Sequence, residues 1–221
     1  MRQKSPPHGN GDGNGRKRAP GRPRSEQARL SILRSTLKLL AKKGFSDLTI
    51  EAVAAHAGVG KATVYRWWPD KAALIADAFA GSTTRKLHFP DTGSLRTDMS
   101  QQMRQLVKIF RSKRGRIVSA MLGAGQADSS LIAAFRERFL KPRRQEAYAT
   151  LRRGIQRGEL RKNVDMDLLL DSLYGPIYMR FLIRHDRLTP DFVEALCELT
   201  LGEAHPSPKS ARSRGRSSGR E

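Results

Sequence analysis

The chain has 221 residues, and its 42 Lys and Arg against 21 Asp and Glu give a formal net charge of +21. This excess goes far beyond what solubility requires and indicates a polyanionic partner, with nucleic acid as the first candidate. The length allows a hydrophobic core without disulfides, and the lone Cys197 excludes an internal one. Because no stretch reaches the roughly 18 apolar residues of a membrane span, we expect a cytoplasmic protein with no membrane partner.

The two ends of the chain differ in composition from the middle. Residues 1–24 and 205–221 are rich in Gly, Pro, Ser and basic side chains and are expected to be disordered basic extensions. In the first extension, Arg22 and Arg24 belong to a Gly-Arg-Pro-Arg segment that suits a narrow minor groove. The alternative is a solvated charge run that attracts DNA without sequence preference, which is also our expectation for the second extension.

Between these ends the hydrophobic pattern predicts helix after helix and no strand. The first helix is expected to begin at Ser25 as the capping residue, with Glu26 in its first turn, and to end at Gly44. Its apolar residues recur at helical spacing and should face the core. They are Leu30, Leu33, Leu37 and Leu40.

Residues 49–71 have the spacing of a helix-turn-helix. Thr49 is placed to cap a short helix, Gly58 to end it in the left-handed conformation, and Val64 and Trp68 to form the buried face of the next helix. Basic and aromatic side chains then remain on the outer face of this second helix. An ordinary helical hairpin in a core is the alternative, but its second helix would not need such an outer face.

In the rest of the chain the hydrophobic pattern predicts six further helices. Lys71 should open a fourth helix, followed by helices near 95–110 and 117–122 and a long helix from Asp128 to Gly158 with a kink at Pro142. Another should follow Asp165, with a bend at Pro176. A final helix should begin at Thr189 and Pro190, because a capping residue followed by proline favours a helix start.

The helix from 168 to 183 is apolar over more than one stripe. Such a helix is buried on several sides. We expect it to serve the core on one side and a second copy of the chain on the other, giving a homodimer through the last two helices. A central core helix in a monomer is the alternative.

The sequence offers no catalytic or metal chemistry. Its five histidines are scattered, it has no HExxH motif or cysteine pair, and no phosphate-binding glycine-rich loop follows a strand. We therefore expect no enzyme activity and no cofactor.

The outer face of the second helix suggests how a duplex would be recognised. Lys61 and Thr63 lie at the helix start that enters a major groove, so they are expected to read bases, and Arg66 could reach a base or a phosphate. The remaining candidates should contact phosphates and set the register, because they offer N–H or O–H groups or lie at helix N-termini. These are Thr49, Tyr65, Trp67 and Lys71.

Residues 25–81 resemble the TetR family of bacterial transcriptional regulators. The resemblance is carried by Gly44-Phe45 before the second helix, Ala57-Gly58-Val59 at the turn, Thr63-Val64-Tyr65 in the next helix, Trp68 at its end and Lys71 at the start of the fourth. Trp67 departs from the family, which often has histidine there. Beyond this region the resemblance is architectural, with Leu173 to Tyr178 similar to a segment near the dimerising helices of some members.

The resemblance implies an all-helical homodimer with a helix-turn-helix DNA-binding domain at 25–70 and an effector-binding and dimerisation domain at 71–204. It further implies a sequence-specific repressor that leaves a palindromic operator when a small-molecule effector binds. An architectural DNA-binding protein with little sequence preference is the alternative function, since the basic ends would suffice for it.

Methionine and aromatic residues of the second domain are candidates for the wall of an effector pocket, because these side chains are adaptable and tyrosine hydroxyls supply polar anchors. Core packing is the alternative for each of them, and the existence of a pocket rests on the family. The candidates are Met99, Met103, Phe110, Met121, Phe135, Phe139, Tyr148, Tyr174 and Tyr178.

Overall fold

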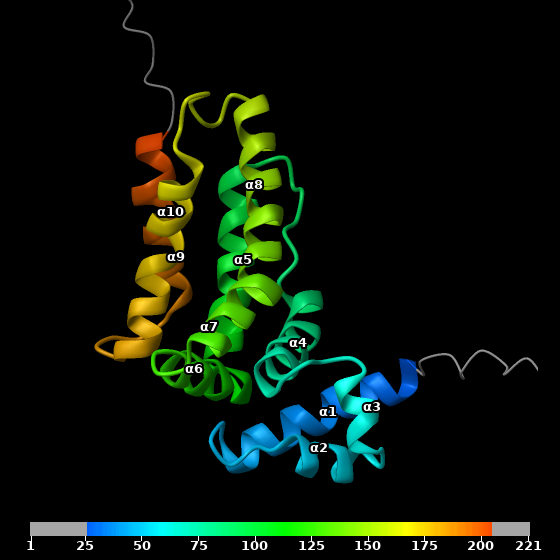
Figure 1. The fold of residues 1–221 in the computed structure, drawn as a ribbon. Helices are drawn as coiled ribbons and strands as arrows, with labels where there is room; N and C mark the ends of the chain where they lie inside the picture. The colour runs from blue at the N-terminus through cyan, green and yellow to red at the C-terminus, as the bar shows by residue number, and fades with distance from the viewer. Residues whose placement is uncertain (1–25, 205–221) are drawn as a thin grey trace, which may run out of the picture.

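A computed structural model describes residues 26–204, and every regular element in that range is helical (Figure 1). This confirms the predicted all-helical fold. The expected cap at Ser25 and both basic extensions lie outside the described residues. The helices are α1 (Glu26–Lys43), α2 (Ile50–Ala57), α3 (Lys61–Tyr65), α4 (Lys71–Thr83), α5 (Leu95–Phe110), α6 (Lys113–Gly125), α7 (Ser129–Phe135), α8 (Lys141–Gln156), α9 (Met166–Ile183) and α10 (Pro190–Ala204).

The first three helices form a small unit that we call the head, and α5 to α10 form a larger unit that we call the body (Figure 1). One prediction for α1 was wrong, because Leu30 is 42% exposed. The buried stripe of α1 is centred instead on Ile32, Leu33 and Leu40, together with Thr36. Thr36 can be buried because its hydroxyl donates to the Ile32 carbonyl at 2.9 Å, which satisfies its polar group.

Helix α4 begins at Lys71 as predicted, connects the head to the body and is buried along most of its length. The Asp70 carboxylate caps its first turn by accepting from Ala73 N–H at 2.7 Å. Toward the body, the Phe79 ring lies edge-on against Phe139, with centroids 4.8 Å apart, and 6.2 Å from Phe135. The core is therefore continuous from the head through α4 into the body.

The long helix predicted from Asp128 to Gly158 is interrupted before the proline. Asp128 caps it as predicted, but residues Arg136–Leu140 form a wider π-helical segment between α7 and α8. Pro142 lies in the first turn of α8 and has no N–H to donate to the Arg138 carbonyl, while Lys141 N–H reaches back five residues to Arg136. The irregularity therefore occurs one turn earlier than the predicted kink.

Helices α9 and α10 lie side by side against α5 (Figure 1). Helix α9 runs through Pro176, and it buries Leu169, Leu170, Leu173, Ile177 and Phe181. The predicted start of α10 is confirmed, because the Thr189 hydroxyl accepts from Phe192 N–H at 3.2 Å.

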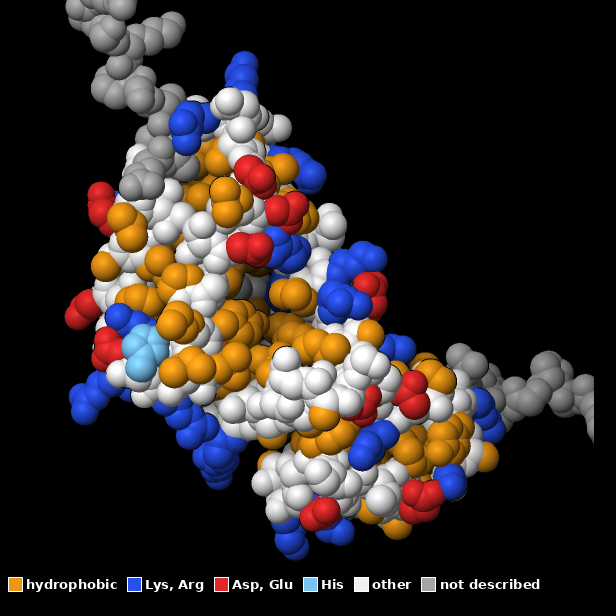
Figure 2. Space-filling view, turned by 60° about the vertical axis from the view of Figure 1, so that its left-hand side comes forward, with side chains coloured by type: hydrophobic (Ala, Val, Ile, Leu, Met, Phe, Trp, Pro, Cys, Tyr) orange, Lys and Arg blue, Asp and Glu red, His pale blue; other side chains and the backbone are white. Residues whose placement is uncertain are grey.

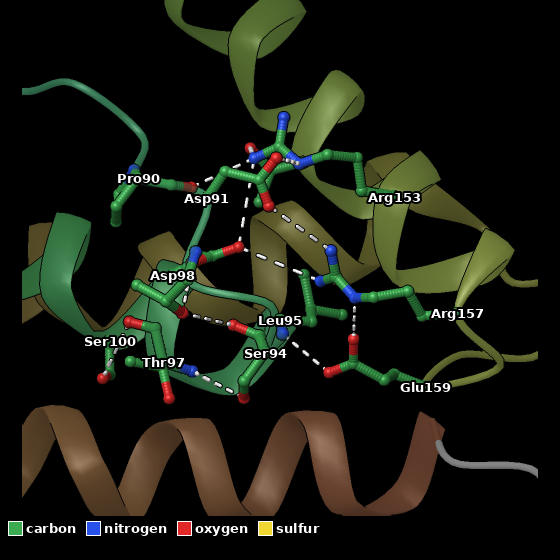
Figure 3. Close-up of polar contacts among 12 residues, drawn as sticks. Pro90, Asp91, Ser94, Leu95, Thr97, Asp98, Ser100, Arg153, Arg157 and Glu159 are labelled. Carbon is green, nitrogen blue, oxygen red and sulfur yellow. Dashed lines mark hydrogen bonds and ion pairs between the residues drawn. The ribbon is translucent and has the colours of Figure 1, made fainter.

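A polar clamp fixes the segment between α4 and α5 to the end of α8 (Figure 3). The fully buried Asp98 accepts from the N–H and the hydroxyl of Thr92, at 2.8 and 2.7 Å. Its second oxygen lies 3.9 Å from both Arg153 and Arg157, and Glu159 accepts from Leu95 N–H at 2.6 Å. The clamp holds the preceding segment, which forms part of a cavity wall described below.

Substitution of two glycines in α6 tests how tightly the turn between α5 and α6 is packed. A Cβ added at Gly115 would lie 1.9 Å from the Phe110 carbonyl oxygen, whereas one at Gly123 would meet nothing within 4 Å. Gly115→Ala should therefore lower the free energy of unfolding by about 1–3 kcal/mol, and Gly123→Ala should raise it by up to about 1 kcal/mol. Chemical denaturation of both variants measures the difference. Equal effects of the two substitutions would contradict this description of the turn.

Candidate nucleic-acid interface

The turn between α2 and α3 has the predicted helix-turn-helix geometry. Thr49 caps α2, with its hydroxyl oxygen accepting from Ala52 N–H at 3.1 Å. Gly58 adopts φ 69° and ψ 35°, the left-handed conformation that a side chain would resist. Val59 N–H then donates to the Ala54 carbonyl at 3.0 Å, which closes the end of α2 and directs the chain into α3.

Helix α3 has one buried and one exposed face. Val64 is fully buried and Trp68 is 1% exposed, so both residues fix the helix against the head. On the other face Lys61, Tyr65 and Arg66 are exposed, and Thr63 is half-buried beside them. The alternative of a helical hairpin enclosed in a core is therefore wrong, since α3 presents a basic and aromatic surface to solvent.

Lys61 has a partner in the free protein that the sequence did not reveal. Its ammonium forms an ion pair with Glu51 of α2 and lies 5.7 Å from the centroid of the Tyr65 ring. The hydrogen bond from Lys61 lowers the pKa of Glu51, and the same bond raises the pKa of Lys61. Because both side chains are more than half exposed, a phosphate or a base can replace Glu51 at little cost.

Trp67 and Lys71, both expected to contact phosphates, also make contacts within the free protein. Trp67 is half-buried, with its ring 5.6 Å from the Arg29 guanidinium and 6.2 Å from the Trp68 ring. The Lys71 ammonium donates to the Phe45 carbonyl at 3.2 Å and lies 4.4 Å from the Phe45 ring centroid. Lys71 therefore holds the loop after α1 against α4, a role that sequence analysis missed.

The minor-groove candidates Arg22 and Arg24 lie outside the described residues. Within residues 26–204, no group of three or more His, Cys, Asp and Glu could hold a metal ion. None of the helices in this range combines the length and the hydropathy that a membrane span needs.

The body encloses a cavity of about 60 Å³ between α5, α8 and α9. Several of the predicted pocket residues lie elsewhere: Met99, Met103 and Met121 are buried in the core, and Phe110 stacks on Phe181 with centroids 4.0 Å apart. Tyr148 bonds to Arg144 and Asp167 at the surface. Phe135 lines a surface groove beside the cavity. The predicted residues that line the cavity itself are Phe139, Tyr174 and Tyr178.

Sequence analysis missed three polar residues of the cavity wall, Gln102, Arg143 and Arg144. Gln102 of α5 accepts from the Tyr174 hydroxyl at 2.5 Å, and Arg143 of α8 is only 8% exposed. Burial raises the pKa of Tyr178 to about 12 and also raises that of Tyr174, so both phenols stay protonated at neutral pH. A run of basic residues around Arg143 gives no sign that one of them points inward.

Comparison with known proteins places both halves of the chain in the same family. Residues 32–78 match the family model described as bacterial regulatory proteins of the tetR family, and residues 89–200 match the tetracyclin repressor-like C-terminal domain. An uncharacterized HTH-type transcriptional regulator of Bacillus subtilis, YdeS, is 42% identical over 176 residues, which span 80% of this chain and 89% of that protein.

Solved structures agree with these matches. The TetR family transcription regulator SCO0332 is 36% identical, with a TM-score of 0.71, over 81% of this chain and 100% of that one. The regulator FadR from Bacillus subtilis, solved in complex with stearoyl-CoA, is 18% identical with a TM-score of 0.62, over 80% of this chain and 99% of that one. The second likeness supports the fold alone.

The pairing of Lys61 with Glu51 predicts opposite effects for two substitutions. Lys61→Ala should relax the choice of base at one position of a bound duplex by about 1–3 kcal/mol, because a base-reading donor is lost. Glu51→Gln should strengthen binding to all duplexes, because it frees Lys61 and removes a charge that repels phosphate. Titration of each variant with single-position variants of one duplex measures both effects. If Lys61→Ala weakened every duplex equally, Lys61 would be a phosphate contact.

Proposed function

Because the chain belongs to the TetR family of HTH-type transcriptional regulators, we propose that it is a homodimeric repressor that leaves a palindromic operator when a small molecule binds the body. Membership of this family makes it a DNA-binding regulator of transcription and not an enzyme. The observation that carries the proposal is the exposed face of α3, held in place by the buried Val64 and Trp68.

The division of roles on α3 follows from what each side chain can reach. Lys61 and Thr63 in its first turn, with Arg66 one turn later, read base edges in the major groove. Thr49, Tyr65, Trp67 and Lys71 flank this face and hold phosphates, which positions the helix without reading sequence. The arm with Arg22 and Arg24 adds either minor-groove contacts or non-specific attraction, as the sequence left open.

A homodimer through α9 and α10 is supported by an apolar stripe that the body leaves exposed. Leu168, Met179 and Ile183 lie on the outer side of α9 with exposures of 65%, 59% and 67%, and Leu199 of α10 is 64% exposed. A monomeric protein rarely leaves such residues together on one face. Two copies related by a two-fold axis would bury the stripe and present two α3 helices to two half-sites.

Release by an effector requires contact between the cavity and the head, and α4 provides it. The Trp68 indole donates to Asp77 of α4 at 2.8 Å, and Arg138 of the π-helical segment donates to the same carboxylate at 2.9 Å. Phe139, the next residue, lines the cavity and packs on Phe79 of α4. A ligand that displaces Phe139 would therefore change the contacts that set the position of α3.

The alternative function is that of an architectural protein that coats DNA through its basic extensions. One experiment distinguishes it from a site-specific regulator. Duplexes that bind the protein are selected from random genomic fragments, and their affinity is compared with that of scrambled duplexes at several salt concentrations. A regulator keeps a specificity ratio of roughly 10³ or more at physiological salt, with a two-fold symmetric motif. An architectural protein loses affinity for both duplexes in parallel, which would contradict the proposal.

The dimer predicts a clear response to one substitution on the exposed stripe. Ile183→Glu places one carboxylate of each copy in the proposed interface, so the protein should become monomeric. Its affinity for the selected duplex should fall by at least about 100-fold, because the two heads no longer bind together. Sedimentation equilibrium and duplex titration measure both effects, with Leu30→Glu on α1 as the exposed-leucine control. A monomeric wild-type protein would contradict the dimer.

The connection through Asp77 predicts non-additive effects on DNA binding. Asp77→Ala and Arg138→Ala should each change the affinity for the selected duplex by about 0.5–2 kcal/mol, although Arg138 lies in the body. The double variant should change it by less than the sum, because both substitutions break the same contact. Lys141→Ala, on the exposed side of the same region, is the control. Strictly additive effects would mean that Asp77 and Arg138 do not act together.

A further inference from the structure

The cavity of the body contains a buried positive charge. Arg143 of α8 is 8% exposed and lines the cavity beside Tyr174 and Tyr178. Its Nη1 donates to the Leu87 carbonyl at 2.9 Å and more weakly to the Thr84 carbonyl at 3.4 Å. A guanidinium stays charged at neutral pH even when burial lowers its pKa, as it does here. A charge is therefore fixed in a largely apolar wall, which is costly unless an anion accompanies it.

The surrounding carboxylates compensate this charge only in part. Neither Asp nor Glu lines the cavity, whereas Arg143 and Arg144 both do. Arg144 is occupied by Asp167 and Asp171. The Nη2 of Arg143 forms an ion pair with Glu146, whose side chain is 46% exposed and therefore weakly coupled through solvent. Among residues 26–204, the buried Nε of Arg143 has no hydrogen-bond partner.

A second polar group beside the cavity also has no partner. The Tyr178 hydroxyl makes no hydrogen bond within the described residues, although its ring packs edge-on against Phe110 at 5.1 Å. The Tyr174 hydroxyl, in contrast, already donates to Gln102. One unpaired guanidinium N–H and one unpaired phenol therefore lie in the same wall, and both are hydrogen-bond donors.

The remaining wall is apolar and adjoins a larger groove. Leu87, Phe89, Leu106, Phe139, Leu140 and Leu170 line the cavity, which at about 60 Å³ holds several times the roughly 10–15 Å³ that one water needs. A groove of about 410 Å³ between α6, α7 and α9 shares Leu140, Arg144, Tyr174 and Tyr178 with it. Figure 2 shows this region as a hollow lined by hydrophobic side chains.

We propose that the cavity binds a small organic acid whose carboxylate pairs with Arg143 and accepts from the Tyr178 hydroxyl, and whose apolar body lies against Phe139 and Leu106. The inference rests on the proposed function, and it names the chemical class of the effector. A monoanion fits better than a phosphate, because the wall offers two unpaired donors and would leave the second charge of a phosphate unpaired.

The position of the acid would connect it to DNA release. Its apolar body would press on Phe139, which follows Arg138 in the π-helical segment and packs on Phe79 of α4. Competition between the ligand carboxylate and Glu146 for the guanidinium would shift Arg143, whose Nη1 holds the segment after α4 through the Leu87 carbonyl. The Phe139 contact and the Arg143 bond would both transmit the effect of the acid to the region of α4 within one copy of the chain, independently of the dimer interface.

The test uses two acids and their neutral counterparts. Isothermal calorimetry on the full chain compares phenylacetate with phenylacetamide and octanoate with octanamide. At least one acid should bind about 10- to 100-fold more tightly than its amide, which is the usual range for a hydrogen bond to a charged group. Equal binding of acids and amides, or no binding by either acid, would overturn the inference.

Variants identify the residues that hold the carboxylate. Arg143→Met should lose the preference for the acid, and Tyr178→Phe should weaken acid binding several-fold and amide binding less, because a carboxylate accepts a stronger hydrogen bond than an amide does. Because Arg143→Met also removes the bond to Leu87 and can impair folding, Glu146→Gln provides a second test. It should strengthen acid binding several-fold, since the competing carboxylate is gone. Glu137→Gln, which removes an exposed carboxylate from the same region, is the matched charge control and should change nothing.

Failure of this inference is distinguishable from failure of the proposed function. A protein that binds one palindromic duplex specifically but neither acid would keep its function as a regulator and lose the organic acid as its effector. An unchanged acid affinity in Glu146→Gln would likewise overturn the assignment of Arg143. Release of the selected duplex by the acid that binds, and not by its amide, would support both.

Discussion

The arrangement of the molecule depends on the burial of α4 between the head and the body. This helix places Asp77 where it accepts from the Trp68 indole on one side and from Arg138 on the other. Phe79 packs against Phe135 and Phe139 of the body in the same stretch. Because protein interiors are close-packed, a change on the body side of α4 must be taken up on the head side. The same contacts therefore stabilise the fold and connect the two proposed sites.

The head could be predicted from sequence because its signals are local. Thr49, Gly58 and the pair Val64 and Trp68 each act within a few residues, so a capping preference or an apolar spacing suffices to identify them. The pairing of Lys61 with Glu51 and that of Lys71 with Phe45 could not be predicted. These contacts depend on how two helices cross, and periodicity does not determine that angle.

In the body, the helices could be predicted but the cavity could not. The spacing of apolar residues and the capping residues predict the helix positions, the cap at Asp128 and the start of α10, whereas they do not predict which residues line the cavity. Arg143 stands in a run of charged residues that a hydrophobic pattern assigns to solvent, and only the packing of α5, α8 and α9 shows that it is buried. Leu30 is the converse case, an apolar residue at helical spacing that the fold leaves exposed. One-dimensional patterns identify faces, and tertiary packing decides which face is covered.

The central claim is that a duplex is bound by the outer face of α3 and not by the basic extensions alone. The two tryptophans of the chain, Trp67 and Trp68, both follow directly after α3, and only Trp67 is appreciably accessible to solvent. The most direct measurement is therefore acrylamide quenching of tryptophan fluorescence with and without the selected duplex, at a salt concentration where binding is saturated. The account predicts that the duplex shields Trp67 and reduces quenching. Unchanged quenching by a saturating duplex would mean that DNA binds elsewhere and would contradict the account.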